Sequence, residues 1–160
     1  MAGRLHPNLE RHEGRRYLER VREMAEALGV GEAFLLREGY LSAEELYRLA
    51  GAADLFLLPY PNLEQVSSGT LSYALALGKA VLSTPFRHAR AALAAGRGVL
   101  LPLEEEAWAQ AVLALAESPE RLREMEERAY AYARDFTWPR VARAYRRLLE
   151  EVADVRPRVA

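Results

Sequence analysis

Residues 54–85, DLFLLPYPNLEQVSSGTLSYALALGKAVLSTP, decide the fold of this chain. They begin with an apolar run of strand length, 55–58, which is followed by two prolines. A polar loop then leads to a turn of small residues, 67–70, and to an alanine-rich helix over 71–77. A second apolar strand, 80–83, closes the unit. A strand, a helix and a strand in this order predict a right-handed crossover between two parallel strands.

The rest of the sequence continues the alternation of strands and helices. Short apolar runs predict two more strands, 33–36 and 97–101, while residues 3–8 have the composition of a loop. Helical spacing of apolar residues, a capping box at 42–45 and two later start signals predict the helices 13–28, 43–53, 86–95, 104–117, 119–134 and 138–152. The predicted fold class is α/β, a Rossmann-like parallel sheet of about four strands with flanking helices and a helical C-terminal end.

The composition limits the classes of function. With 160 residues, 51% of them hydrophobic, the chain is long enough for one domain with a buried core, and we expect a single domain over 1–160. The net charge of -1 argues against nucleic acid as a partner. Cysteine is absent, which excludes a thiol nucleophile and fits a cytoplasmic location. No apolar run is long enough to span a bilayer.

The turn at 67–70 allows two interpretations. Its free backbone N–H groups stand at the start of a helix, where the helix dipole favours an anion. Gly69 carries no side chain that would keep a ligand from the backbone, and the hydroxyl groups beside it are further donors. The same small residues are also typical of a simple helix cap. Both interpretations stay open from the pattern alone.

Five short motifs occur in a specific order along the chain. They are Gly39 after an expected strand, DLFLLPY over 54–60, GKAVLSTP over 78–85, RGVLLP over 97–102 and FTW over 136–138. Together they resemble the C-terminal domain, which binds the donor nucleotide sugar, of GT-B glycosyltransferases of the family 4 (group 1) type. The resemblance covers about residues 6–150. It implies a hexosyltransferase that retains the configuration of the sugar and needs no metal or cofactor beyond a nucleotide diphosphate sugar as donor.

The chain departs from the glutamate pair that this family carries in the central unit. Alignment on Gly78 places Gln65 and Tyr73 where the family has the two glutamates of Glu-x7-Glu. The chain thereby resembles a divergent subgroup that also has a His-Pro pair, here His6-Pro7, ahead of a helix of the Gly-x-x-Tyr type, here at 14–17. Gln65 is able to hydrogen-bond sugar hydroxyls as a neutral group.

The resemblance, together with the turn, suggests a set of site residues. For the donor sugar and its phosphates these are Glu64, Gln65, Ser67, Ser68, Gly69 and Thr70, and for the nucleoside they are Gly39, Tyr40 and Tyr73. We name no catalytic residue. The three histidines are not at metal-ligand spacing, so we expect no metal site.

Two strand–helix units and an acceptor-binding N-terminal domain precede this region in the family. We therefore expect the chain to be part of a longer, N-terminally truncated transferase that is inactive in isolation. Its expected partners are a nucleotide sugar and either the missing domain or a second copy, with membrane association only through the absent domain. The alternatives are a non-catalytic α/β module that associates with a partner chain or with itself, and a sugar-nucleotide epimerase.

Residues outside the central unit lead to two further expectations. His88 follows the strand 80–83, where it is either a cleft residue or a histidine on a helix surface. Five aromatic residues near the C-terminus lie at the spacing of core helices, and we expect them to pack inward: Tyr130, Tyr132, Phe136, Trp138 and Tyr145.

Overall fold

The computed structural model describes residues 2–3 and 7–155, and the chain forms two compact units, residues 1–48 and 49–160. The first unit holds β1 (Ala2–Gly3), α1 (Pro7–Glu13), α2 (Arg16–Ala27), β2 (Arg37–Glu38) and the first part of α3 (Ala43–Ala52). The expectation of a single domain stays a prediction.

In the first unit, β1 and β2 pair in parallel, with Ala2 opposite Arg37. The predicted strand over 33–36 is wrong, because the backbone N–H groups of Ala33 and Phe34 donate to the carbonyl of Val30 in a turn. Those amides are therefore not available to a strand ladder. The predicted loop over 3–8 is also wrong where it is described, since Gly3 belongs to β1 and α1 starts at a proline, which the first helical position tolerates. His6 lies outside the described residues.

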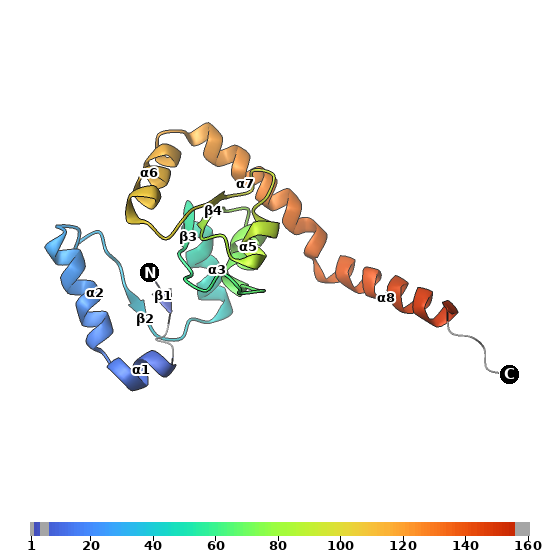
Figure 1. Ribbon diagram of the computed structural model, residues 1–160, viewed down its shortest axis with the longest axis horizontal. Coiled ribbons are helices and arrows are strands. Elements are labelled where there is room, and N and C mark those ends of the chain that lie inside the picture. The colour runs from blue at the N-terminus through green and yellow to red at the C-terminus, as the bar shows by residue number, and fades with distance from the viewer. Residues whose placement is uncertain (1, 4–6, 156–160) are drawn as a thin grey trace. The chain divides into compact units, whose positions relative to one another are not determined.

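The second unit is built on a three-stranded parallel sheet (Figure 1). Its order is β3 (Leu55–Leu58), β4 (Ala80–Ser83) and β5 (Val99–Leu100), so β4 is the central strand. β3 and β4 pair along their whole length, and α4 (Gly69–Ala76) connects them. The parallel crossover predicted for residues 54–85 is confirmed, as is the α/β fold class.

Helices flank this sheet and form the C-terminal end of the chain (Figure 1). After α4, they are α5 (Arg87–Ala92), α6 (Glu105–Ala116), α7 (Pro119–Ala133), the short 3-10 helix η1 (Arg134–Phe136) and α8 (Trp138–Val155). α4 starts two residues earlier than the apolar pattern indicates, because the hydroxyl of Ser68 caps it. The other helices begin close to their start signals.

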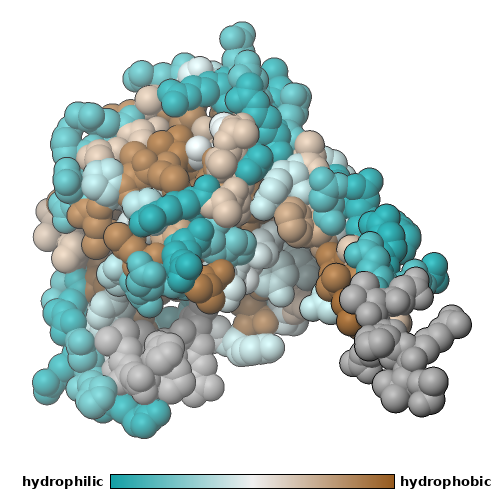
Figure 2. Space-filling view, turned by 45° about the vertical axis from the view of Figure 1, so that its right-hand side comes forward, coloured by the Kyte–Doolittle hydropathy of each residue, from teal (hydrophilic) through white to brown (hydrophobic). Residues whose placement is uncertain are grey.

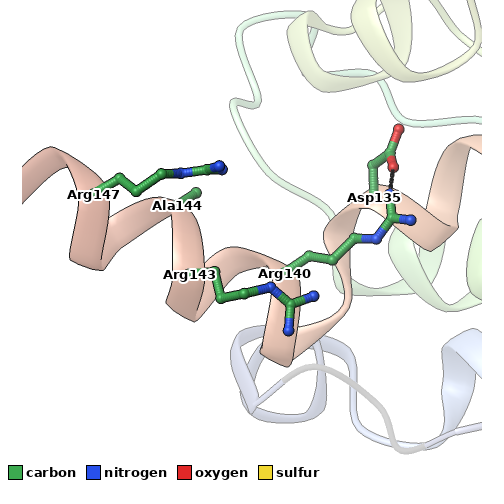
Figure 3. Close-up of a pocket in the computed structure, with 5 residues that line it drawn as sticks. All are labelled: Asp135, Arg140, Arg143, Ala144 and Arg147. Carbon is green, nitrogen blue, oxygen red and sulfur yellow. Dashed lines mark hydrogen bonds and ion pairs between the residues drawn. The ribbon is translucent and has the colours of Figure 1, made fainter.

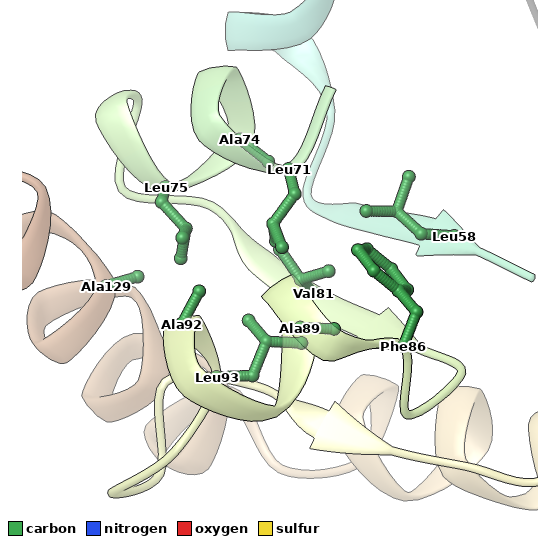
Figure 4. Packing of buried hydrophobic residues seen from close by; sticks show 10 residues of the cluster. All are labelled: Leu58, Leu71, Ala74, Leu75, Val81, Phe86, Ala89, Ala92, Leu93 and Ala129. Carbon is green, nitrogen blue, oxygen red and sulfur yellow. The ribbon is translucent and has the colours of Figure 1, made fainter. Parts of the chain in front are cut away.

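The two faces of β4 point into two hydrophobic clusters, as alternation along a strand requires. Val81 lies in a cluster with side chains from α4, α5 and α7, which Figure 4 shows facing one another across the same interior. Ala80 and Leu82 lie in a second cluster with Leu115 of α6 and Met125 of α7. α7 thus contributes to both clusters and fixes the helices to the sheet.

Gly78 fixes how closely α4 approaches α7. It has a φ of 67°, the left-handed conformation in which glycine commonly ends a helix. A Cβ atom at this position would meet the Cβ of Tyr130 at 3.1 Å. A larger residue at this position would therefore push α4 away from α7, the helix that leads directly into η1.

α8 carries apolar side chains that no described residue covers. None of its residues over 138–153 is buried, and Tyr145, Leu148 and Val152 are among the exposed ones. Figure 2 shows hydrophobic and hydrophilic residues next to one another on this helix, at the right of the view. The expectation that the C-terminal aromatic residues pack inward is wrong for Tyr130, Phe136, Trp138 and Tyr145, which are exposed, whereas Tyr132 packs against the first hydrophobic cluster.

No helix in the described part of the chain is long and apolar enough to cross a membrane.

Candidate functional site

Two loops meet at the carboxyl ends of β3 and β4, the edge where open parallel sheets bind ligands. Residues 59–68 connect β3 to α4, and residues 84–86 connect β4 to α5. The buried Thr84 joins them: its amide donates to the carbonyl of Leu58 at 3.2 Å and its hydroxyl to that of Tyr60 at 2.7 Å. These hydrogen bonds therefore fix the positions of the two loops relative to each other where they leave the sheet.

The start of α5 adds two further bonds to the first loop. The amide of Arg87 donates to the carbonyl of Leu63 at 3.0 Å, and the amide of His88 donates to that of Gln65 at 3.3 Å. The side chain of Gln65 in turn donates to the carbonyl of Ser67 at 2.8 Å. The first amides of α5 are thus occupied by protein, which leaves the start of α4 as the place where amides are open to a ligand.

Ser68 organises the start of α4. Its hydroxyl accepts a hydrogen bond from the amide of Leu71 at 3.2 Å, and its own amide donates to Nδ1 of His88 at 3.0 Å. Ser68 is only 5% exposed, so both bonds are shielded from water. The interpretation of the turn as a helix cap is therefore confirmed for this residue.

The anion-binding interpretation is left with two amides. Among residues 2–3 and 7–155, no hydrogen bond uses the backbone N–H of Gly69 or Thr70. Both residues are exposed and are the first two of α4, where the positive end of the helix dipole lies. The turn at 67–70 thus contains both the Ser68 cap and two backbone amides that no described residue binds.

The other predicted donor-site residues lie along the same loop. Glu64 is exposed, and its carboxylate is 3.9 Å from the guanidinium of Arg87. Gln65 is half-buried, and Ser67 is exposed. The structure therefore brings Glu64, Gln65 and Ser67 into one continuous segment with the start of α4.

The predicted nucleoside-binding residues belong to different units. Gly39 and Tyr40 follow β2 in the first unit, where Gly39 has a φ of 115° and Tyr40 is exposed. Tyr73 lies on α4 in the second unit and is 42% exposed. Only Tyr73 can therefore be described together with the turn at 67–70.

A groove of about 470 Å³ runs beside α4. One wall is a stripe of α4 at helical spacing, and aromatic residues of α7, η1 and α8 form much of the rest. Its lining is Gly69, Ser72, Tyr73, Leu75, Ala76, His88, Tyr132, Ala133, Phe136 and Trp138. The sequence pattern predicted that Tyr132, Phe136 and Trp138 pack in the core. The small residues Gly69, Ser72 and Ala76, at i, i+3 and i+7 of α4, were the available signal for an open face.

His88 lines the groove and also accepts a hydrogen bond from the capped turn. Of the two interpretations of His88, the structure therefore favours that of a cleft residue. Because Nδ1 accepts the Ser68 amide, the proton of the neutral ring is on Nε2. Burial lowers the pKa of His88 below its usual value, which favours this neutral form. No described residue accepts a hydrogen bond from Nε2. The ring also lies edge-on to Phe86, with 6.5 Å between the centroids.

A second groove, of about 450 Å³, follows α8 and is strongly basic. Figure 3 shows Arg140, Arg143 and Arg147 along one side of the helix, with Ala144 between them and Asp135 of η1 bound to Arg140. Three arginines against one carboxylate attract anions in general, and the effect weakens with salt because the groups are solvated.

Within the described residues, no group of three His, Asp or Glu side chains is placed to hold a metal ion.

A search of solved structures finds a similar arrangement in a crystal structure of a glycosyltransferase from Rickettsia africae ESF-5. The match has a TM-score of 0.72 at 18% sequence identity and covers 92% of this chain. The chain has a glycosyltransferase-like fold. It corresponds to 39% of the length of the Rickettsia protein. No protein-family model matches the sequence, and no curated protein sequence matches it either.

Proposed function

We propose that this chain is the donor-binding half of a retaining glycosyltransferase of the family 4 (group 1) type. The observation that carries the proposal is the pair of open amides of Gly69 and Thr70. They lie at the first turn of α4, at the carboxyl edge of a parallel sheet, in a glycosyltransferase-like fold. Such amides are suited to the diphosphate of a nucleotide sugar.

The remaining site residues take roles that their chemistry allows. Gln65 and Glu64 hydrogen-bond sugar hydroxyls, and Tyr73 contacts the ribose, whereas the assignment of Gly39 and Tyr40 to the nucleoside stays a prediction. The contribution to catalysis is electrostatic, because the two amides stabilise the negative charge that gathers on the departing diphosphate.

The amide of Gly69 can be removed without damage to the helix. Gly69 is the first helical residue, where proline is favoured and its missing N–H costs nothing. The residue before it, Ser68, has φ −143° and ψ 116°, which is in the extended region that proline requires of its predecessor. Gly69→Ala is the matched control, since it adds a Cβ atom in ordinary contact with Tyr73 at 4.0 Å and retains the N–H.

The experiment measures binding of UDP and GDP to the wild-type chain and to both variants by isothermal titration calorimetry. We expect one nucleotide to bind, Gly69→Ala to bind it about as well, and Gly69→Pro to lose about tenfold in affinity, as the loss of one charge-assisted hydrogen bond predicts. Equal affinity of the proline and alanine variants would contradict a role of this amide, and failure of both nucleotides to bind the wild-type chain would contradict the proposal as a whole.

The exposed apolar face of α8 favours one other function, that of a non-catalytic module that associates with a second copy. Tyr145, Leu148 and Val152 form a stripe of this face at i, i+3 and i+7. Sedimentation equilibrium over a range of concentrations tests it: a dimer that Leu148→Gln dissociates, in a chain without nucleotide affinity, would favour the module. A monomer at all concentrations would exclude association through this face.

A further inference from the structure

The groove beside α4 is uncharged, although charged residues are common in this chain. None of its ten lining residues is Asp, Glu, Lys or Arg, and its only titratable group near neutral pH, His88, has a lowered pKa because of burial. A phosphate group would gain no charge partner inside it. The groove therefore suits the uncharged part of a ligand, and its volume of about 470 Å³ lies within the usual range of small-molecule sites.

Its aromatic walls leave ring faces open. Trp138 is 86% exposed and Phe136 is 60% exposed, although both line the groove. Tyr132 is already engaged, because the guanidinium of Arg97 lies 4.1 Å from its ring centroid and the ring of Phe136 lies 4.8 Å away. Open aromatic faces beside a buried floor, which Leu75 supplies, are what a planar ring stacks on.

The groove is continuous with the open amides. Gly69 belongs both to the phosphate turn and to the groove lining, and His88 lines the groove while its Nδ1 holds the Ser68 amide. A ligand whose phosphate is bound at the amide of Gly69 can therefore place its adjoining uncharged part in the groove. The Nε2–H of His88 is a further hydrogen-bond donor in the groove lining that no described residue occupies.

We propose that this groove is the nucleoside subsite, in which the base of the donor stacks on Trp138 and Phe136 and the Nε2–H of His88 donates to a ligand oxygen. The inference rests on the proposed function, because it takes a nucleotide as the ligand. It adds to that function a base-binding surface made by the C-terminal segment of the same unit. Specificity for the ligand then depends on stacking in this groove.

Trp138→Ala tests the stacking surface, and Trp138→Phe retains a ring. Tyr145→Ala is the matched control, since it removes an exposed aromatic residue of α8 that does not line the groove. Because Trp138 is so exposed, the variants are expected to melt like the wild-type chain, which circular dichroism checks. Each is titrated calorimetrically with the nucleotide that binds and with inorganic pyrophosphate.

We expect Trp138→Ala to lower the affinity for the nucleotide about tenfold, Trp138→Phe to lower it less, and Tyr145→Ala to leave it unchanged. Pyrophosphate should bind the wild-type chain and Trp138→Ala equally, because it places nothing in the groove. Nucleotide affinity unchanged by Trp138→Ala would overturn the subsite while the phosphate turn stands. An equal loss for nucleotide and pyrophosphate would also overturn it, since Trp138 would then act through the turn. The weaker nucleotide binding expected of Gly69→Pro tests the proposed function separately.

Discussion

The cap of α4 allows a sharp prediction, because the chain offers a second serine at the same helical position. Ser68 caps α4 with a hydrogen bond from the amide of Leu71 to its hydroxyl. Ser118 precedes the first residue of α7, yet its side chain makes no capping hydrogen bond. Both serines belong to the second unit, so Ser68→Ala and Ser118→Ala compare a cap in use with a cap position that is not used.

The magnitude follows from burial. Replacing a capping serine by alanine costs about 1 kcal/mol, within a range of roughly 0.5–2. At Ser68 the upper end applies, because Leu71 is fully buried and its amide has no water to replace the lost acceptor. We expect Ser68→Ala to cost about 2 kcal/mol, or roughly 4–8 °C in the melting temperature, and Ser118→Ala to cost at most about 0.5 kcal/mol.

Chemical denaturation followed by circular dichroism measures the free energy of unfolding of both variants. Equal costs would refute the reasoning, because they would show that the hydrogen bond to the Leu71 amide contributes nothing specific. Titration of Ser68→Ala with nucleotide separates stability from function. The backbone amides of Gly69 and Thr70 remain, so affinity should change much less than in Gly69→Pro.

Three further predictions concern stability. Gly98→Ala is expected to lower the free energy of unfolding by about 1–3 kcal/mol, since its Cβ would lie 2.6 Å from the carbonyl oxygen of Val81. The same change at Gly51, which has open space around it in α3, should raise that free energy by about 0.5–1 kcal/mol, and urea denaturation measures both. Burial lowers the pKa of His88, so the unfolded chain binds more protons than the folded one as pH falls below 6.5, and stability should decline there; His88→Gln should flatten that part of a pH series of melts. Hydrogen bonds from Ser42 lower the pKa of Glu45, so its contribution is present above pH 4.5 and lost as pH falls through the lowered pKa; Glu45→Gln should remove this acid-side step.

The central unit was predictable because its signals are local. Apolar runs of four residues, the prolines after β3 and the small residues before α4 each act within a few positions of the chain. The same holds for the capping box, in which the amide of Glu45 donates to the hydroxyl of Ser42 and the carboxylate of Glu45 accepts from the amide of Ser42. Patterns of this kind specify elements almost without tertiary context.

The errors arise where pairing over a distance decides the outcome. β2 consists of Arg37 and Glu38, a charged pair without apolar periodicity, and it forms because its backbone pairs with β1 far back in the chain. Trp138 and Tyr145 lie at helical spacing, but spacing states only which side chains share a face. Whether another element covers that face depends on the rest of the chain.

His88 illustrates what the sequence could not provide for the site. It lies 20 positions from Ser68, and no motif connects the two. Their hydrogen bond exists because parallel pairing of β3 with β4 brings both following loops to one edge. The turn at 67–70 could therefore be recognised as a helix start from the sequence, whereas its hydrogen bond to His88 and the groove beside it required the three-dimensional arrangement.

The bonds between residues 59–68 and the start of α5 have a consequence for the energetics of binding. The carbonyls of Leu63 and Gln65 accept from α5, and Thr84 holds the beginning of the loop. A loop that is fastened before the ligand arrives loses little conformational entropy on binding. Association with a nucleotide should therefore be fast and require no loop closure. In a hydrogen-exchange measurement, the nucleotide should slow exchange only at the amides that it contacts directly. The conformation of the loop is thus set before any ligand binds, by Thr84 and by the helix that follows the next strand.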